Sequence, residues 1–306
     1  MLNSLILPSY SWSIMPVVSL LYALICFFSL VALLPDHSDW VPVWYILGAT
    51  AVAFTLFRVN ADTLAGLRFT IGDADENFIS MILCIAFALA VHRFFRCRWM
   101  YVPIVIPVIG LVGAGAIVTG SRTGAISLIV TLVIAVFGFM RRNLRRSAIM
   151  VVLSIVGYLI IQTWTLLPNR LLAAPIPEAL ADRGGRADIA ELYLRHADQW
   201  VIFGVGYGNA PYFLLSVERL FAEAHGLWLG LVIEAGIVGL AAFIGVLLAV
   251  IRSAQGGLFH FLALSPIMVF GLSVSGLERS AILWFVLAIA LRICSDANGK
   301  ASLPVA

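Results

Sequence analysis

One arginine occupies a sequence position where a charged side chain is energetically costly. Arg122 lies in the segment Thr119-Gly120-Ser121-Arg122-Thr123-Gly124, which separates two long apolar runs. If those runs cross a membrane, the guanidinium sits at or just below the interface, where charge is expensive unless it is functional or paired. The flanking glycines permit a tight turn and the close approach of a ligand. The structural alternative is an arginine that only snorkels at a hairpin tip.

His225 and Glu234 are the next candidates, at the start of another apolar run. An imidazole titrates near neutrality and can act as a base, although a lone histidine at an interface is more often structural. Glu234 stands nine residues further on, which is roughly 13 Å deeper along a continuous helix. An acid at that depth is a functional candidate, but hydrogen bonding between helices, beside glycines that allow close packing, is the favoured interpretation.

The composition shows which elements must position these residues. Of the 306 residues, 62% are hydrophobic and only 11% are charged, with a mean hydropathy of +1.04. A soluble domain carries about 25% charged residues, so this chain could not cover its surface with polar groups. Its apolar runs are too long and too unalternating for barrel strands. We therefore expect an all-α, polytopic transmembrane helix bundle.

A window of about 20 apolar residues gives about nine expected spans. They lie near 13–34, 40–57, 78–95, 100–119, 124–140, 147–167, 224–251, 258–275 and 279–293. We expect a single integral membrane domain over 1–306, with a long external loop at 168–223. In that loop the apolar residues recur at helical spacing from Ile189 to Trp200, which predicts an amphipathic helix on the membrane or the bundle.

Two arginine clusters orient the spans. Arg93, Arg96 and Arg98 form one, and Arg141, Arg142, Arg145 and Arg146 form the other. The positive-inside rule places both in the cytoplasm. Nine basic residues then face outward, and all are arginine: Arg58, Arg68, Arg122, Arg170, Arg183, Arg186, Arg195, Arg219 and Arg279. Because a planar guanidinium binds phosphate oxygens bidentately, this surplus predicts an anionic, phosphate-bearing ligand.

Two other patterns predict less. The glycines of Gly204-Val-Gly-Tyr-Gly208 follow an expected helix rather than a strand and lack a P-loop lysine, so a nucleotide fold is not expected. Asp73, Asp75 and Glu76 could bind a divalent ion, but acids clustered in a loop are usually only solvated. We expect no metal and no cofactor.

The ordered set of motifs resembles the O-antigen ligase and polymerase family. It comprises Ser121-Arg-Thr-Gly124, Gly185-Arg186, Trp200 with Gly204-Val-Gly-Tyr-Gly-Asn209, Ala224-His225 and Glu234-Ala-Gly-Ile-Val-Gly239. The segment from Arg68 to Asn77 is similar to the family's preceding external loop. Each motif is weak alone, whereas the ordered set over roughly residues 65 to 250 is fairly specific.

The resemblance implies a metal-independent membrane glycosyltransferase of bacterial surface polysaccharide assembly. Such an enzyme moves a glycan from an undecaprenyl diphosphate carrier to an acceptor sugar, either the lipid A core or a growing chain, at the periplasmic face of the inner membrane. By position, Arg122, Arg186 and Arg68 would hold the diphosphate and His225 would act beside the acceptor hydroxyl. Glu234 and Arg183 are supporting candidates. Membrane lipid is an expected partner, and nucleic acid is not.

Two other functions stay open. A flippase or transporter for a lipid-linked glycan would also use outward arginines, but it should show internal repeats and broken helices at matched positions in two halves. The sequence shows neither. A non-catalytic membrane subunit of a polysaccharide assembly system is the other alternative, against which the intact Arg122, Arg186 and His225 argue.

Overall fold

The computed structural model describes residues 18, 21–22, 24–25, 27–29, 40–59, 76–140, 144–163, 186–253, 258–272, 274 and 283–288. Throughout these residues the regular structure is helical. The chain divides into two compact units. Unit 1 comprises Met1–Asp36, Ile176–Gln255 and Gly271–Ala306, and unit 2 comprises His37–Pro175 and Gly256–Phe270.

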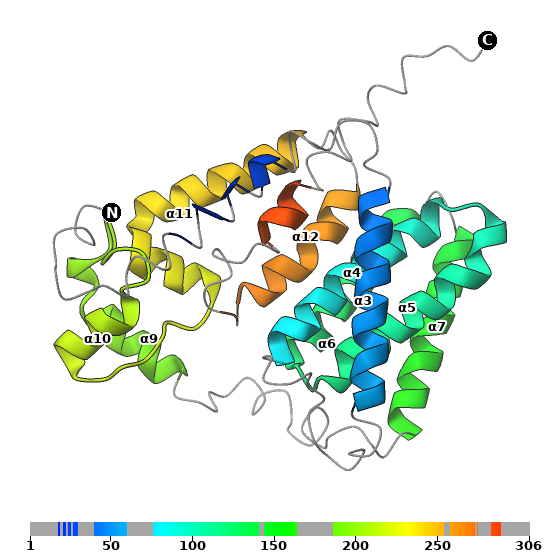
Figure 1. Cartoon of the computed structure of the whole chain (residues 1–306), viewed down its shortest axis with the longest axis horizontal. Coiled ribbons are helices and arrows are strands. Elements are labelled where there is room, and N and C mark those ends of the chain that lie inside the picture. The colour runs from blue at the N-terminus through cyan, green and yellow to red at the C-terminus, as the bar shows by residue number, and fades with distance from the viewer. Residues whose placement is uncertain are drawn as a thin grey trace, which may run out of the picture. The chain divides into compact units, whose positions relative to one another are not determined.

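Unit 2 is a bundle built around helix α4 (Figure 1). Its helices are α3 (Trp40–Val59), α4 (Glu76–Arg96), α5 (Val102–Val118), α6 (Arg122–Met140), α7 (Leu144–Thr163) and α12 (Leu258–Phe270), with a short 3-10 turn, η3 (Trp99–Tyr101), before α5. Helix α4 packs against α3, α5, α6 and α12. It is largely apolar on all sides and almost completely buried, as expected of a helix at the centre of a bundle.

Small and hydroxyl residues let the helices of unit 2 approach one another. A side-chain methyl at Gly115 of α5 would meet Ala53 of α3 at 3.1 Å and Leu83 of α4 at 3.2 Å. Thr131 of α6 and Ser265 of α12 share a buried hydrogen bond of 3.0 Å. Close backbone approach and hydroxyl contacts of this kind are typical of helices that associate in lipid.

Unit 1 includes one long helix and two short ones whose bounds the structure describes. They are α9 (Arg186–Arg195), a 3-10 turn η4 (Ala197–Gln199), α10 (Ala210–Glu218) and α11 (Leu227–Ser253). Phe243 of α11 packs edge-on against Trp284, whose ring also packs against Phe27. The expected amphipathic helix is present as α9, but it ends at Arg195 and η4 continues the chain to Trp200.

Five of the described helical segments are long and apolar enough to cross a membrane: Val41–Arg58, Asn77–Arg96, Trp99–Val118, Arg122–Met140 and Leu227–Arg252. Each coincides with an expected span. Helices α7 and α12 also lie where spans were expected, although α12 has 13 residues, fewer than the roughly 20 that a crossing requires. The expected spans at 13–34 and 279–293 fall largely outside the described residues, so the number nine is not confirmed.

The expectation of an unbroken helix from His225 past Gly239 is wrong. Gly236 has φ 70° and ψ −175° inside α11, which breaks the helix into two segments. Figure 1 shows the two segments running in different directions. The depth deduced for Glu234 from a straight helix therefore does not apply.

Candidate functional site

Arg122 is the first residue of α6, and a polar network fixes the turn that precedes it. The Ser121 hydroxyl accepts a hydrogen bond from the Gly124 N–H at 3.1 Å, as a helix N-cap does. The same hydroxyl donates to the side-chain oxygen of Asn77, at the start of α4, at 2.8 Å. The Ser121 N–H in turn donates to Thr119 Oγ1 at 3.3 Å. Arg122 is thereby held, half-buried, at the N-terminal end of a 19-residue helix.

This position suits an anion. The first N–H groups of a helix are not bonded within it, and the helix dipole places partial positive charge at the same end. A guanidinium beside that end adds a full charge and a planar pair of donors. Helix N-termini bind phosphate and other anions in many proteins.

His225 lies two residues before α11 begins. The Leu227 N–H donates to the Gly271 carbonyl at 2.7 Å, which ties the first turn of α11 to the chain that follows α12. The neighbouring Ala224 is buried in a small core with Tyr193, Trp200 and Ile233, among others. The imidazole itself is half-buried. His225 is thus partly exposed beside a backbone that is hydrogen-bonded at Leu227.

The glycine-rich loop and the turn before it supply hydrogen-bond partners to the backbone groups at the break in α11. In a continuous helix the N–H groups of Ile237 and Val238 would bond to the carbonyls of Ile233 and Glu234. Here those two carbonyls accept instead from Val205 N–H (2.9 Å) and Gly206 N–H (3.0 Å). The Ile237 and Val238 N–H groups donate to the carbonyls of the turn before the loop, Val201 at 2.8 Å and Ile202 at 3.4 Å. Two hydrogen bonds of a continuous helix are thus replaced by four hydrogen bonds between α11 and residues 201–206.

Glycine is required on both sides of this contact. Gly204 has φ +74° and Gly236 has φ +70°, in the left-handed region that side chains rarely adopt. A methyl group on Gly204 would collide with the Glu234 carbonyl, and one on Gly236 with the Ile202 carbonyl. The glycine-rich loop and the segment Glu234–Gly239, which looked independent in the sequence, are therefore joined by backbone hydrogen bonds. We call this contact between residues 201–206 and 233–238 the backbone lock.

Glu234 is at the centre of the lock, with only 5% of its surface exposed. Burial raises the pKa of the nearby Tyr193 phenol, and the carboxylates of Glu234 and Glu223 raise that pKa further. The phenol therefore stays protonated and donates to the Ala222 carbonyl at 2.8 Å. Glu234 is thus surrounded by the same packed core as the Tyr193 phenol.

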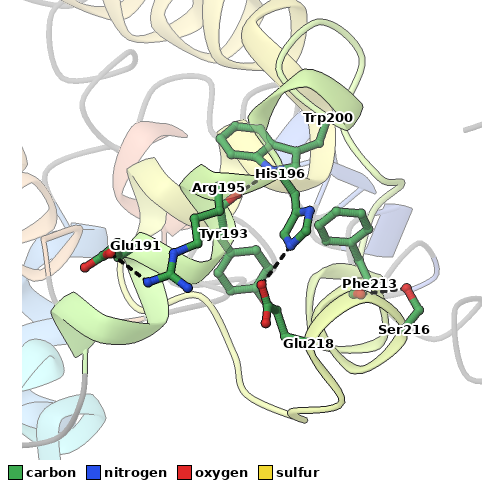
Figure 2. Close-up of polar contacts among 8 residues, drawn as sticks. All are labelled: Glu191, Tyr193, Arg195, His196, Trp200, Phe213, Ser216 and Glu218. Atoms are coloured by element: carbon green, nitrogen blue, oxygen red, sulfur yellow. Dashed lines mark hydrogen bonds and ion pairs between the residues drawn. The ribbon is translucent and has the colours of Figure 1, made fainter.

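Figure 2 shows a contact that the sequence did not reveal: His196 and Glu218 face each other at 2.8 Å between Nε2 and Oε1. His196 follows α9 and Glu218 ends α10, and the Phe213 ring stands edge-on to the imidazole. Trp200 Nε1 donates to the Tyr193 carbonyl at 3.0 Å. The contacts of His196 with Glu218 and Phe213 join the end of α9 to α10. The pair is 22 residues apart in the chain, so no local spacing could have identified it.

The structure describes only part of the expected site. Arg122 belongs to unit 2, whereas His225 and Glu234 belong to unit 1. Arg186 begins α9, but its side chain lies outside the described residues, as do Arg68 and Arg183. The possible metal ligands Asp73 and Asp75 also lie outside them.

Arg122, His225 and Glu234 lie within a segment that matches a known protein family. Residues 107–244 match the O-antigen ligase family. This match confirms the family resemblance that the ordered motifs predicted. It runs from α5 into α11 and therefore contains Arg122, the glycine-rich loop, His225 and Glu234. No curated relative matches the chain.

The match to the O-antigen ligases and the apolar helices together establish a coarse description. The chain is an integral membrane protein of polysaccharide biosynthesis. The matched family indicates glycosyl transfer of the O-antigen ligase type, which uses a lipid-linked glycan and an acceptor.

Proposed function

We propose that the chain transfers a glycan from undecaprenyl diphosphate to an acceptor sugar, at the periplasmic face of the bacterial inner membrane. The observation that carries the proposal is the family match over 107–244, because it contains both Arg122 and His225. The external loop at 168–223, which includes α9 and α10, faces the periplasm in this scheme, and about nine spans anchor the chain. Neither a metal ion nor a nucleotide takes part.

In the proposed reaction an acceptor hydroxyl attacks the anomeric carbon of the glycan. The bond from that carbon to the carrier phosphate breaks, and the diphosphate leaves with the electron pair. His225 takes the proton of the attacking hydroxyl or orients that hydroxyl. Arg122 at the α6 N-terminus stabilises the charge that develops on the leaving diphosphate. Arg186 and Arg68 are proposed as further phosphate ligands, with Arg183 in support.

Glu234 has a different proposed role. Its backbone carbonyl takes part in the lock with the glycine-rich loop, and its side chain is buried near Tyr193. Tyr193 belongs to the core that also contains Ala224, the neighbour of His225. Glu234 is therefore proposed to position His225 through this core.

The test is transfer by purified protein in vesicles that contain a polyprenyl diphosphate-linked oligosaccharide, with released carrier diphosphate and elongated acceptor measured together. His225→Ala should reduce the rate by roughly 10²–10⁴, as expected for loss of a general base. His225→Gln keeps a hydrogen-bonding group without the basicity, so near-normal transfer in that variant would assign orientation instead. His196→Gln is the matched control, a histidine of the same unit outside the proposed site. A chelator should leave wild-type transfer unchanged.

Full activity of His225→Ala, at equal membrane abundance, would contradict the catalytic role. Ligase and polymerase activities separate in cells from which the gene is deleted. Accumulation of long carrier-linked chains would indicate a ligase, and accumulation of single repeat units would indicate a polymerase.

One observation favours the flippase alternative. Helix α11 is broken at Gly236, and broken helices are a feature of transporters. The groups freed by this break, however, are bonded to the loop 201–206. The vesicle assay separates the two functions, because a flippase would move the donor across the membrane without elongating an acceptor.

A further inference from the structure

A long uncharged stretch lies within the expected external loop at 168–223. No Asp, Glu, Lys or Arg occurs from Gln199 to Val217, a stretch that includes the turn, the glycine-rich loop and most of α10. Charged residues stand immediately outside it, at Asp198 and Glu218. Such a pattern is unusual for a solvated loop, where polar and charged residues dominate.

The turn at the start of this stretch points large apolar side chains outward. Ile202 is 57% exposed and Phe203 is 76% exposed, with Val201 beside them at 39%. Trp200, by contrast, is buried in the core of the unit. Three consecutive exposed apolar side chains of this size indicate an interaction surface rather than scattered surface residues.

The turn is continuous with the surface of a helix that is apolar enough to cross the membrane. Its carbonyls at Val201 and Ile202 accept the N–H groups of Ile237 and Val238. Ile237 and Val238 are themselves exposed. The exposed apolar surface then continues along α11 through Ile244, Leu248 and Ile251. Since an exposed apolar face of a membrane-spanning helix meets lipid, the neighbouring turn is placed to meet lipid as well.

Part of the backbone of the turn is hydrogen-bonded within the protein. A backbone polar group without a partner is costly in lipid, so internal pairing lowers the cost of placing a turn at the membrane surface. The Val201 N–H donates to the Ala197 carbonyl at 2.9 Å, and the Val201 and Ile202 carbonyls are paired with α11. These three backbone groups therefore do not require water as a partner.

We propose that the turn Val201–Phe203, together with Ile237 and Val238, is a membrane wedge that contacts the acyl chains of the bilayer. The wedge anchors the lock between the glycine-rich loop and α11, and so sets the core that carries Ala224 and His225 against the membrane surface. It does not depend on the reaction that His225 performs.

The test uses single cysteines in a background without the four native cysteines, Cys26, Cys84, Cys97 and Cys294. Phe203→Cys reports on the wedge, and Ile202→Cys is a second reporter. Asp198→Cys is the matched control, because Asp198 is an exposed residue in the turn just before the wedge. Each protein is labelled with an environment-sensitive fluorophore and placed in vesicles of brominated or ordinary phosphatidylcholine.

Brominated lipid should quench the label at 203 and at 202 strongly and the label at 198 weakly. With unlabelled protein and a water-soluble maleimide on both sides of the membrane, the thiol of the Phe203→Cys variant should react at least about tenfold more slowly than the control, because apolar surroundings disfavour the thiolate. Equal rates with no quenching would place the turn in water and overturn the proposal. Protection from maleimide without quenching by brominated lipid would mean that a protein covers the turn, and would overturn it too.

Discussion

At the scale of single residues, a substitution of Arg122 tests whether glycan transfer requires the planar guanidinium or only a positive charge. Arg122→Lys keeps the positive charge at the α6 N-terminus but loses the planar fork. We expect a loss of tenfold or more in transfer rate, for a lost interaction of ~1.5–3 kcal/mol, with unchanged membrane abundance. The measurement is the vesicle transfer assay, with Arg98→Lys as the control at an exposed arginine of the same unit. Wild-type transfer by the Arg122 variant would mean that the residue only anchors the turn.

The sequence identified Arg122 and His225, but not the groups that hold them. A charge between two apolar runs and a histidine at the start of a third are local signals. The contacts that position them are not: Ser121 bonds to Asn77 across 44 residues, and the Leu227 N–H bonds to the distant carbonyl of Gly271. The His196–Glu218 pair was missed for the same reason. Hydrogen bonds between distant elements depend on the packing of helices, which periodicity does not encode.

At the scale of elements, the break in α11 is the feature with the largest expected effect on stability. Gly236→Ala places a methyl group on a residue with φ 70° and ψ −175°, a conformation nearly confined to glycine that costs other residues about 1–3 kcal/mol, and against the Ile202 carbonyl. Gly204→Ala does the same against Glu234. Gly245→Ala is the control in the same helix, since nothing lies within 4 Å of its added methyl. Thermal unfolding in detergent should show lower Tm values for both lock variants and an unchanged or higher Tm for the control.

Equal Tm values for Gly236→Ala and Gly245→Ala would contradict the lock.

The sequence predicted the extent of most helices well, because length and hydropathy are enough to define an apolar span. It did not predict the break, because glycines in an apolar run equally mark close helix packing. Only the pairing of residues 233–238 with 201–206, which are distant in the chain, distinguishes the two interpretations.

At the scale of the whole molecule, α4 separates two chemically different ends of unit 2. Near its last turn, the buried Arg146 donates to the Phe94 carbonyl at 2.7 Å and to the Cys97 carbonyl at 2.6 Å. A cation there complements the C-terminal end of the helix dipole. At the first turn, Asn77 bonds to the Ser121 network beside Arg122. The 21 residues of α4 span about 30 Å. Arg146, which bonds to the last turn of α4, therefore lies at one end of the helix and Arg122 lies near the other.

This arrangement predicts the topology that the proposed function requires. With both clusters in the cytoplasm, the Arg98→Cys variant should react with a membrane-impermeant maleimide only after the cells are permeabilised. The Asp198→Cys variant should react in intact cells, because the donor glycan is proposed to be used on the outer side. Both positions are exposed, so a difference in labelling reports the side of the membrane rather than burial. Labelling at position 198 that also required permeabilisation would put α9 and the turn that follows it in the cytoplasm, away from the proposed substrate.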